Sequence, residues 1–143
     1  MIIDCHGHFT TAPNALEDWR RRQIANLSTP ALGPSPDELH ISDDELVEAI
    51  RINQLRLMQE RGSDLTIFSP RASFMAHHIG NFETSATWAA ICNTLCHRVS
   101  QLFPEHFVGA AMLPQSPGVD IATCIPELER CVVDYGFVGV NMN

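Results

Sequence analysis

Short apolar segments alternate with longer amphipathic segments along this chain, and the alternation limits the folds open to it. Residues 64–69, 107–113 and 137–142 predict strands, because each is rich in apolar side chains and is bounded by glycine or proline. The segments 43–61 and 85–102 carry apolar residues at the spacing of one helix face. Near-continuous apolar strands are typical of a parallel sheet covered on both faces, so the pattern predicts a parallel α/β fold.

The remaining residues predict further elements and one long loop. Residues 1–7 read as a first strand, and 14–27 as a helix whose three arginines at 20–22 are expected mostly in solvent. Residues 28–40 are rich in proline, which predicts an irregular loop of the kind that often forms a lid or pocket wall. A last helix is predicted at about 124–136.

Helix-capping residues support two of the predicted helices. Ser42 and Glu45 have capping-box spacing, and Gly62 suits the position after the last turn of the same helix. Thr84 is expected to cap the helix at 85–102.

The order of these elements narrows the choice of fold. A glycine-rich dinucleotide fingerprint does not follow the first strand, and the chain has no P-loop, so a flavodoxin-like sheet or a (β/α) barrel remains. A final strand as apolar as 137–142 would be an exposed edge if nothing covered it. A complete barrel needs about 250 residues. We therefore expect residues 1–143 to be the N-terminal half of a (β/α)8 TIM barrel, truncated after its fourth strand.

Two histidines at the end of the first strand are candidate metal ligands. Alternate side chains of a strand share a face, so His6 and His8 should point the same way, with Asp4 below them. Neutral imidazole is a good ligand for zinc and related ions, and Gly7 is expected to leave room for one. α/β folds place their chemistry at this end of the strands, although a pair of surface histidines is the alternative. Asp4 is expected to be a buried structural carboxylate.

Three further residues are candidates for substrate binding. Arg71 follows the second strand on the expected active-site side, where its guanidinium could grip a carboxylate; a structural salt bridge is the alternative. His77 could orient a carboxylate or carry a proton, although a loop histidine bonded to backbone fits equally. Asn141 lies in the fourth strand and could line the same pocket.

Composition excludes some partners and leaves others open. Nine Lys and Arg against seventeen Asp and Glu give a net charge of −8, which argues against nucleic acid or an anionic membrane as partner but not against a small anionic substrate. Neither a membrane-length apolar run nor a secretory signal is evident, so a cytoplasmic protein with reduced thiols is expected. Cys92 and Cys96 lie one helical turn apart, a spacing that can suggest a metal pair, but helix packing is favoured because Ile91 and Leu95 set the apolar stripe beside them.

Three stretches carry a resemblance to a known family. They are M-I-I-D-C-H-G-H at 1–8, Q-E-R-G-S-D-L-T-I-F-S-P-R-A-S-F-M-A-H-H-I-G at 59–80 and A-A-M-L-P-Q-S-P-G-V at 110–119. The chain resembles the amidohydrolase superfamily, in the branch of aminocarboxymuconate-semialdehyde decarboxylase. Within that branch it is most similar to hydratases of protocatechuate 4,5-cleavage. The stretch at 59–80 is the most specific of the three.

The resemblance implies a cofactor and a reaction. His6 and His8 would bind a divalent metal, expected to be zinc, while the family's further histidine and carboxylate ligands match nothing in this chain. The reaction would add water to a carbon–carbon double bond of a small tricarboxylate, and the full-length enzyme is expected to be a homo-oligomer. A metal-dependent decarboxylase of the same branch and an inactive half-barrel fragment are the alternatives.

Overall fold

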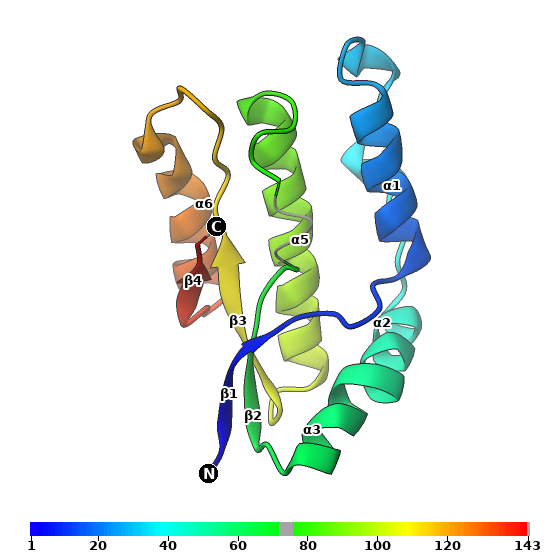
Figure 1. The fold of residues 1–143 in the computed structure, drawn as a ribbon, viewed down its shortest axis with the longest axis vertical. Helices are drawn as coiled ribbons and strands as arrows, with labels where there is room; N and C mark the ends of the chain where they lie inside the picture. The colour runs from blue at the N-terminus through cyan, green and yellow to red at the C-terminus, as the bar shows by residue number, and fades with distance from the viewer. Residues whose placement is uncertain (72–75, 143) are drawn as a thin grey trace.

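Four parallel strands form one sheet, whose spatial order β1-β2-β3-β4 is also their order along the chain. The computed structural model describes residues 1–71 and 76–142, so residues 72–75 of the 59–80 stretch lie outside it. Figure 1 shows the strands side by side, with α5 packed along β3. The half-barrel of four strands with intervening helices is confirmed. The strands are β1 (Ile3–Gly7), β2 (Leu65–Phe68), β3 (Phe107–Met112) and β4 (Gly139–Asn141).

Helices occupy every predicted position, but two contain π-helical turns. The expected helix at 43–61 consists of α2, a π-helical segment η3 and α3, and the last helix is similarly divided. Short 3₁₀ turns, η1 and η2, interrupt the loop at 28–40. The bounds are α1 (Asn14–Ala25), η1 (Pro30–Leu32), η2 (Pro36–Glu38), α2 (Asp43–Ala49), η3 (Ile50–Leu55), α3 (Arg56–Arg61), α5 (Phe82–Leu102), η4 (Ile121–Cys124), α6 (Ile125–Glu129) and η5 (Arg130–Asp134).

The structure confirms the predicted caps of the helix at 43–61 but not the predicted cap of α5. The reciprocal capping box of Ser42 and Glu45 is present, and Gly62 has the left-handed conformation expected after α3. Thr84 does not cap α5. Asn81 does so, because its side-chain oxygen accepts the Thr84 N–H at 3.0 Å and also the Thr84 hydroxyl.

The core lies between the sheet and the helices. Phe68 of β2 and Phe107 of β3 meet edge to face there, with ring centroids 5.3 Å apart. Cys92 and Cys96 are buried in the same cluster, which agrees with the predicted role in helix packing. Burial raises the pKa of both thiols.

Arg20 is buried, contrary to the expectation that all three arginines at 20–22 are solvated. Its guanidinium lies 4.8 Å from the centroid of the Trp88 ring and donates to the Gln23 side chain at 2.5 Å. A planar guanidinium can stack on an indole face, and this contact draws the side chain between α1 and α5. Burial lowers its pKa.

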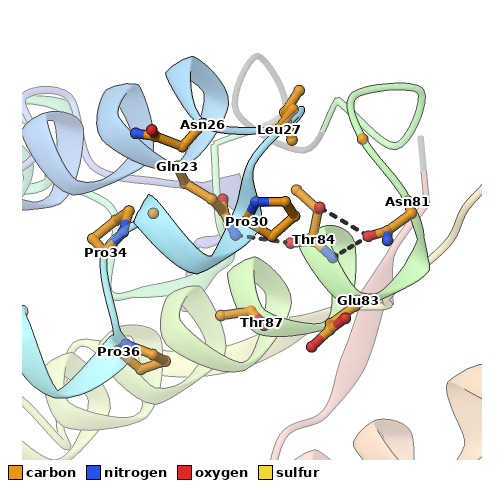
Figure 2. A pocket seen from close by; sticks show the side chains of 12 residues that line it. Gln23, Asn26, Leu27, Pro30, Pro34, Pro36, Asn81, Glu83, Thr84 and Thr87 are labelled. Atoms are coloured by element: carbon orange, nitrogen blue, oxygen red, sulfur yellow. Dashed lines mark hydrogen bonds between the residues drawn. The ribbon is translucent and has the colours of Figure 1, made fainter.

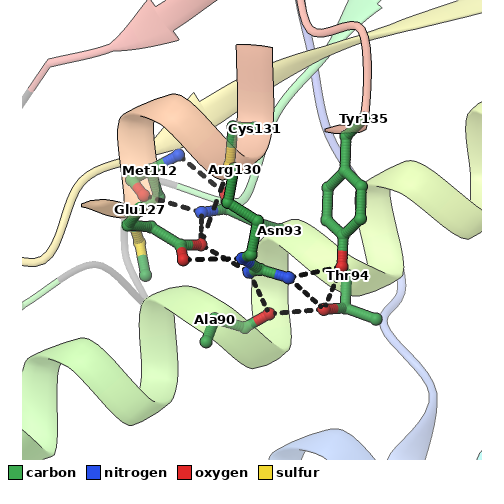
Figure 3. A network of polar contacts seen from close by, with 8 residues as sticks. All are labelled: Ala90, Asn93, Thr94, Met112, Glu127, Arg130, Cys131 and Tyr135. Atoms are coloured by element: carbon green, nitrogen blue, oxygen red, sulfur yellow. Dashed lines mark hydrogen bonds and ion pairs between the residues drawn. The ribbon is translucent and has the colours of Figure 1, made fainter. Parts of the chain in front are cut away.

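A polar network ties β3 to the two helices beside it (Figure 3). Asn93 of α5 is fully buried; its amide donates to the Met112 carbonyl and its oxygen accepts the Met112 N–H, both at 2.8 Å. The same amide donates to Glu127 at 2.7 Å. Glu127 binds Arg130 through two hydrogen bonds, which raise the Arg130 pKa, and Arg130 donates to the Tyr135 hydroxyl. The network holds the carboxyl end of β3 against α5 and α6.

A close contact makes Gly109 of β3 sensitive to substitution. A Cβ atom at this position would lie 2.2 Å from the ring of Phe137, which is buried. We expect Gly109→Ala to lower the free energy of unfolding by about 2–3 kcal/mol, because the ring cannot move without displacing core residues. Gly139→Ala is the matched control, since a Cβ there meets no atom within 4 Å. Equal urea midpoints for the two variants would contradict the prediction.

Candidate metal centre

A β-bulge shapes the end of β1. Asp4 is in register with Thr66 and Gly7 with Phe68, so β1 has one residue more than β2 between these pairs. His6 lies within this bulge. Bulges next to functional sites commonly redirect side chains, so strict alternation along the strand does not give the direction of the His6 side chain.

The bulge overturns the prediction that Asp4 lies buried beneath the histidines. Asp4 is paired in register with Thr66, which is fully buried and faces the helix layer. The Asp4 side chain itself is only half-buried, so it is not the buried carboxylate that was predicted. An oxygen of the Asp4 carboxylate accepts the backbone N–H of His6 at 3.1 Å. Asp4 therefore satisfies an amide inside the bulge.

The two histidines lie close together at the carboxyl end of β1. Their ring centroids are 5.8 Å apart, and their planes are inclined at 82°. Two imidazoles that bind one zinc ion through bonds of 2.0–2.1 Å place their centroids roughly 5 Å apart, so a small adjustment would bring them together. The Nδ1 atom of His8 lies 3.0 Å from the carbonyl oxygen of Phe9. A proton on Nδ1 would complete that bond and leave Nε2 as the metal-binding atom.

Gly7, between the histidines, makes its close contact on the helix side. A Cβ atom there would lie 2.1 Å from the Thr66 methyl group and 3.3 Å from the side-chain nitrogen of Gln54. Gln54 comes from the π-helical segment η3 and accepts the Thr10 hydroxyl at 3.1 Å. The glycine is therefore required by packing against β2 and η3, whereas its role in making room for a metal stays a prediction.

Two hydrogen bonds from Ser69 also restrain the carbonyl group of Gly7. The Ser69 N–H donates to the Gly7 carbonyl at 2.8 Å, and the Ser69 hydroxyl approaches the same oxygen at 3.3 Å. The side-chain nitrogen of Asn141 donates to that hydroxyl at 3.2 Å. Asn141 at the end of β4 thus reaches the histidine pair through Ser69, which is buried.

Arg71 and His77 both follow β2, as predicted, but their surroundings differ. Arg71 is exposed and lines a cavity of about 20 Å³ with Phe9 and Trp88. Both ring nitrogens of His77 are buried, and neither has a hydrogen-bond partner among the described residues. Burial, and secondarily the adjacent His78, lower the pKa of His77 and so favour its neutral form.

The proline-rich loop does form a pocket wall, as predicted (Figure 2). Together with the end of α1 and the start of α5 it encloses a cavity of about 400 Å³. None of the predicted site residues lines this cavity, so the loop does not enclose the histidine pair in this structure. The loop residues in its wall are Pro30, Gly33, Pro34 and Pro36.

The described part of the chain supplies a pair of candidate metal ligands and no larger set. Residues 1–71 and 76–142 contain no group of three or more His, Cys, Asp or Glu side chains able to hold an ion. His6 and His8 fit two positions of a metal site by type and spacing.

Comparison with protein families decides the family. The model of the family described as amidohydrolase matches residues 3–143. The chain belongs to the amidohydrolase family. The predicted resemblance is confirmed over nearly the whole sequence.

Two hydratases are similar to this amidohydrolase chain along all of its 143 residues. One is the 2-keto-4-carboxy-3-hexenedioate hydratase of Sphingobium sp. (strain NBRC 103272 / SYK-6), which is 54% identical over 143 residues. The other is the crystal structure of 4-oxalomesaconate hydratase from Rhodopseudomonas palustris, with 67% identity and a TM-score of 0.92. Each comparison covers 100% of this chain, which spans 41% of either relative's length.

A decarboxylase shares the fold of this amidohydrolase. The dihydroxybenzoic acid decarboxylase from Polaromonas sp. JS666, whose structure contains manganese and the inhibitor 2-nitroresorcinol, is 24% identical with a TM-score of 0.63. The comparison covers 99% of this chain and 38% of that enzyme. Within the described residues of the amidohydrolase, no helix has the length and hydropathy needed to cross a membrane.

Ser69 and Gln54 are the contacts around the histidines that sequence reasoning missed. Both are polar and buried, and both bond to residues far away in sequence. The alternation of side chains along β2 could have indicated Ser69. It continues the face of Leu65 and Ile67, which is opposite the face of the fully buried Thr66 and Phe68.

Proposed function

We propose that residues 1–143 supply the histidine pair of a metal-dependent hydratase of protocatechuate 4,5-cleavage. The enzyme would add water to the carbon–carbon double bond of 4-oxalomesaconate, giving 4-carboxy-4-hydroxy-2-oxoadipate. The observation that carries the proposal is 67% identity, along the whole chain, to an enzyme named as 4-oxalomesaconate hydratase. Because the chain spans 41% of that relative, the activity is proposed for a protein of the relative's length.

His6 and His8 would hold the ion, which we propose to be zinc because neutral imidazole suits it. When bound, the ion polarises an oxygen of the conjugated substrate or lowers the pKa of the attacking water. Further ligands would come from beyond the described residues, since those residues offer no group of three.

Three residues of this chain are proposed to act on the substrate. Arg71 would grip a carboxylate through two parallel hydrogen bonds. His77, whose pKa is lowered by burial, would orient another carboxylate or carry a proton in its neutral form. Asn141 donates one of the two N–H bonds of its amide to Ser69, so the second N–H is the donor it would offer to a carboxylate of the substrate. We also propose that the complete protein is a homo-oligomer and that it is located in the cytoplasm.

The fate of the substrate's carbon atoms tests the proposal. Incubation of the complete protein with 4-oxalomesaconate should bleach the absorbance of the conjugated double bond without release of carbon dioxide. Release of carbon dioxide would instead identify a decarboxylase of the same branch. Lack of any reaction by a metal-loaded complete protein would remove both lyase assignments.

Arg71→Ala should chiefly raise KM. Loss of a charge-assisted grip on a carboxylate removes about 1.5–3 kcal/mol, equivalent to roughly tenfold or more in kcat/KM. The measurement is steady-state hydration of 4-oxalomesaconate by the complete protein. Arg61→Ala, an exposed arginine at the end of α3, is the control. Unchanged kinetics in the Arg71 variant would remove it from the site.

A further inference from the structure

We propose that Ser69 and Asn141 are positioning residues that aim the metal-binding histidines through the peptide group of Gly7. The inference rests on the proposed metal site. It concerns the Ser69 hydroxyl and the N–H bond that Asn141 donates to it, and neither group would contact the metal or the substrate. It assigns Ser69 a role in the site and gives the amide nitrogen of Asn141 a second function.

The Gly7 carbonyl is the point at which this control would act, because its peptide group joins Gly7 to His8 and Gly7 follows His6 directly. Its oxygen accepts the Ser69 N–H at 2.8 Å and lies 3.3 Å from the Ser69 hydroxyl. The N–H bond belongs to the pairing of neighbouring strands, whereas the hydroxyl bond is an additional restraint on the same atom.

Burial makes the Ser69 hydroxyl a stringent restraint. Ser69 is 1% exposed, so water cannot readily replace either of its partners. The hydroxyl donates to Gly7 and accepts from Asn141 at 3.2 Å, and this second bond fixes the direction of its single proton. Asn141 thereby orients the proton of Ser69 toward the histidine segment, across the strand that separates β2 from β4.

The helix side of the same peptide is already fixed by packing. The Thr66 methyl group fills the space where a Cβ on Gly7 would lie, and Gln54 is in contact there too. The backbone between the histidines is therefore clamped from two sides, by packing on one and by the Ser69–Asn141 relay on the other. Loss of the relay should loosen the aim of the imidazoles without unfolding the sheet.

A zinc titration of the complete protein tests this relay without any assay of activity. The NMR resonances of His6 and His8 report zinc affinity, and the carbonyl carbon shift of Gly7 reports its hydrogen bond before metal is added. Ser69→Ala should move the Gly7 shift in the metal-free complete protein and weaken zinc binding by about tenfold, the scale of loss when a group that orients ligands is removed. Ser100→Ala is the matched control, because its hydroxyl donates to the His97 carbonyl at 2.7 Å on α5.

A double-mutant cycle isolates the role of Asn141. If Asn141 acts through Ser69, Asn141→Ala should weaken zinc binding and also move the Gly7 shift. Adding Asn141→Ala to Ser69→Ala should then cost little further affinity. Fully additive losses, or an unchanged Gly7 shift in either variant, would overturn the relay. The half-buried Asn141 also provides the test if the Ser69 variant fails to fold.

His6→Ala separates failure of the relay from failure of the proposed site. If His6→Ala abolishes zinc binding while Ser69→Ala binds like wild type, only the relay is wrong. If zinc binding is the same with and without His6, the metal site is wrong, and with it the proposed function.

Discussion

His6→Ala should remove the bound metal and abolish hydration in the complete protein. The variant leaves one imidazole where two are proposed, and the ion's contribution of several kcal/mol corresponds to a rate loss of about 10³-fold or more. His6 is exposed, so its loss should leave the fold intact. Metal content by mass spectrometry and initial rates with 4-oxalomesaconate measure the two effects.

His40→Ala is the control for that variant, because it removes another exposed imidazole from the loop before α2. It should keep its metal and its rate. A His6→Ala protein that retains stoichiometric metal and normal turnover would show that the H-x-H pair is not the centre of the site.

Asn93→Leu should be the most destabilising substitution predicted for this chain, at about 4 kcal/mol. Leucine matches asparagine in size but leaves the N–H and carbonyl of Met112 unpaired in the core. It also removes the amide that donates to Glu127. The free energy of unfolding in urea measures the loss.

Asn53→Leu is the matched control for the network variant. Asn53 is half-buried, and its amide donates to the Ala49 carbonyl, at 3.4 Å, within its own helical turn. We expect a change within about 1 kcal/mol for it. A similarly small change for Asn93→Leu would mean that the network adds little to the stability of β3.

Periodicity was sufficient to predict the order of elements, because apolar strands and amphipathic helices each leave a local pattern. The strands β2 and β3 lie within the predicted ranges, and the capping box at Ser42 marks the start of α2 as expected. The H-x-H pair was also visible, since it needs only two neighbouring positions of one strand.

Features that depend on distant partners could not be predicted in the same way. The bulge at His6 exists because β1 and β2 differ in length between their paired residues, a relation between segments about sixty positions apart. Ser69 becomes important only when Asn141 is beside it, and Arg20 is buried only because Trp88 offers its ring. Each case required the tertiary arrangement, which local residue patterns do not contain.

The agreement between strand order and chain order has a consequence for synthesis on the ribosome. Each new strand finds its neighbour already present, so the sheet can grow by one unit at a time as the chain emerges. Ser69 reaches Gly7 when the second strand docks, but Asn141 arrives only with the fourth. The nascent chain would therefore acquire His6 and His8, the proposed metal ligands, first and their full orientation last.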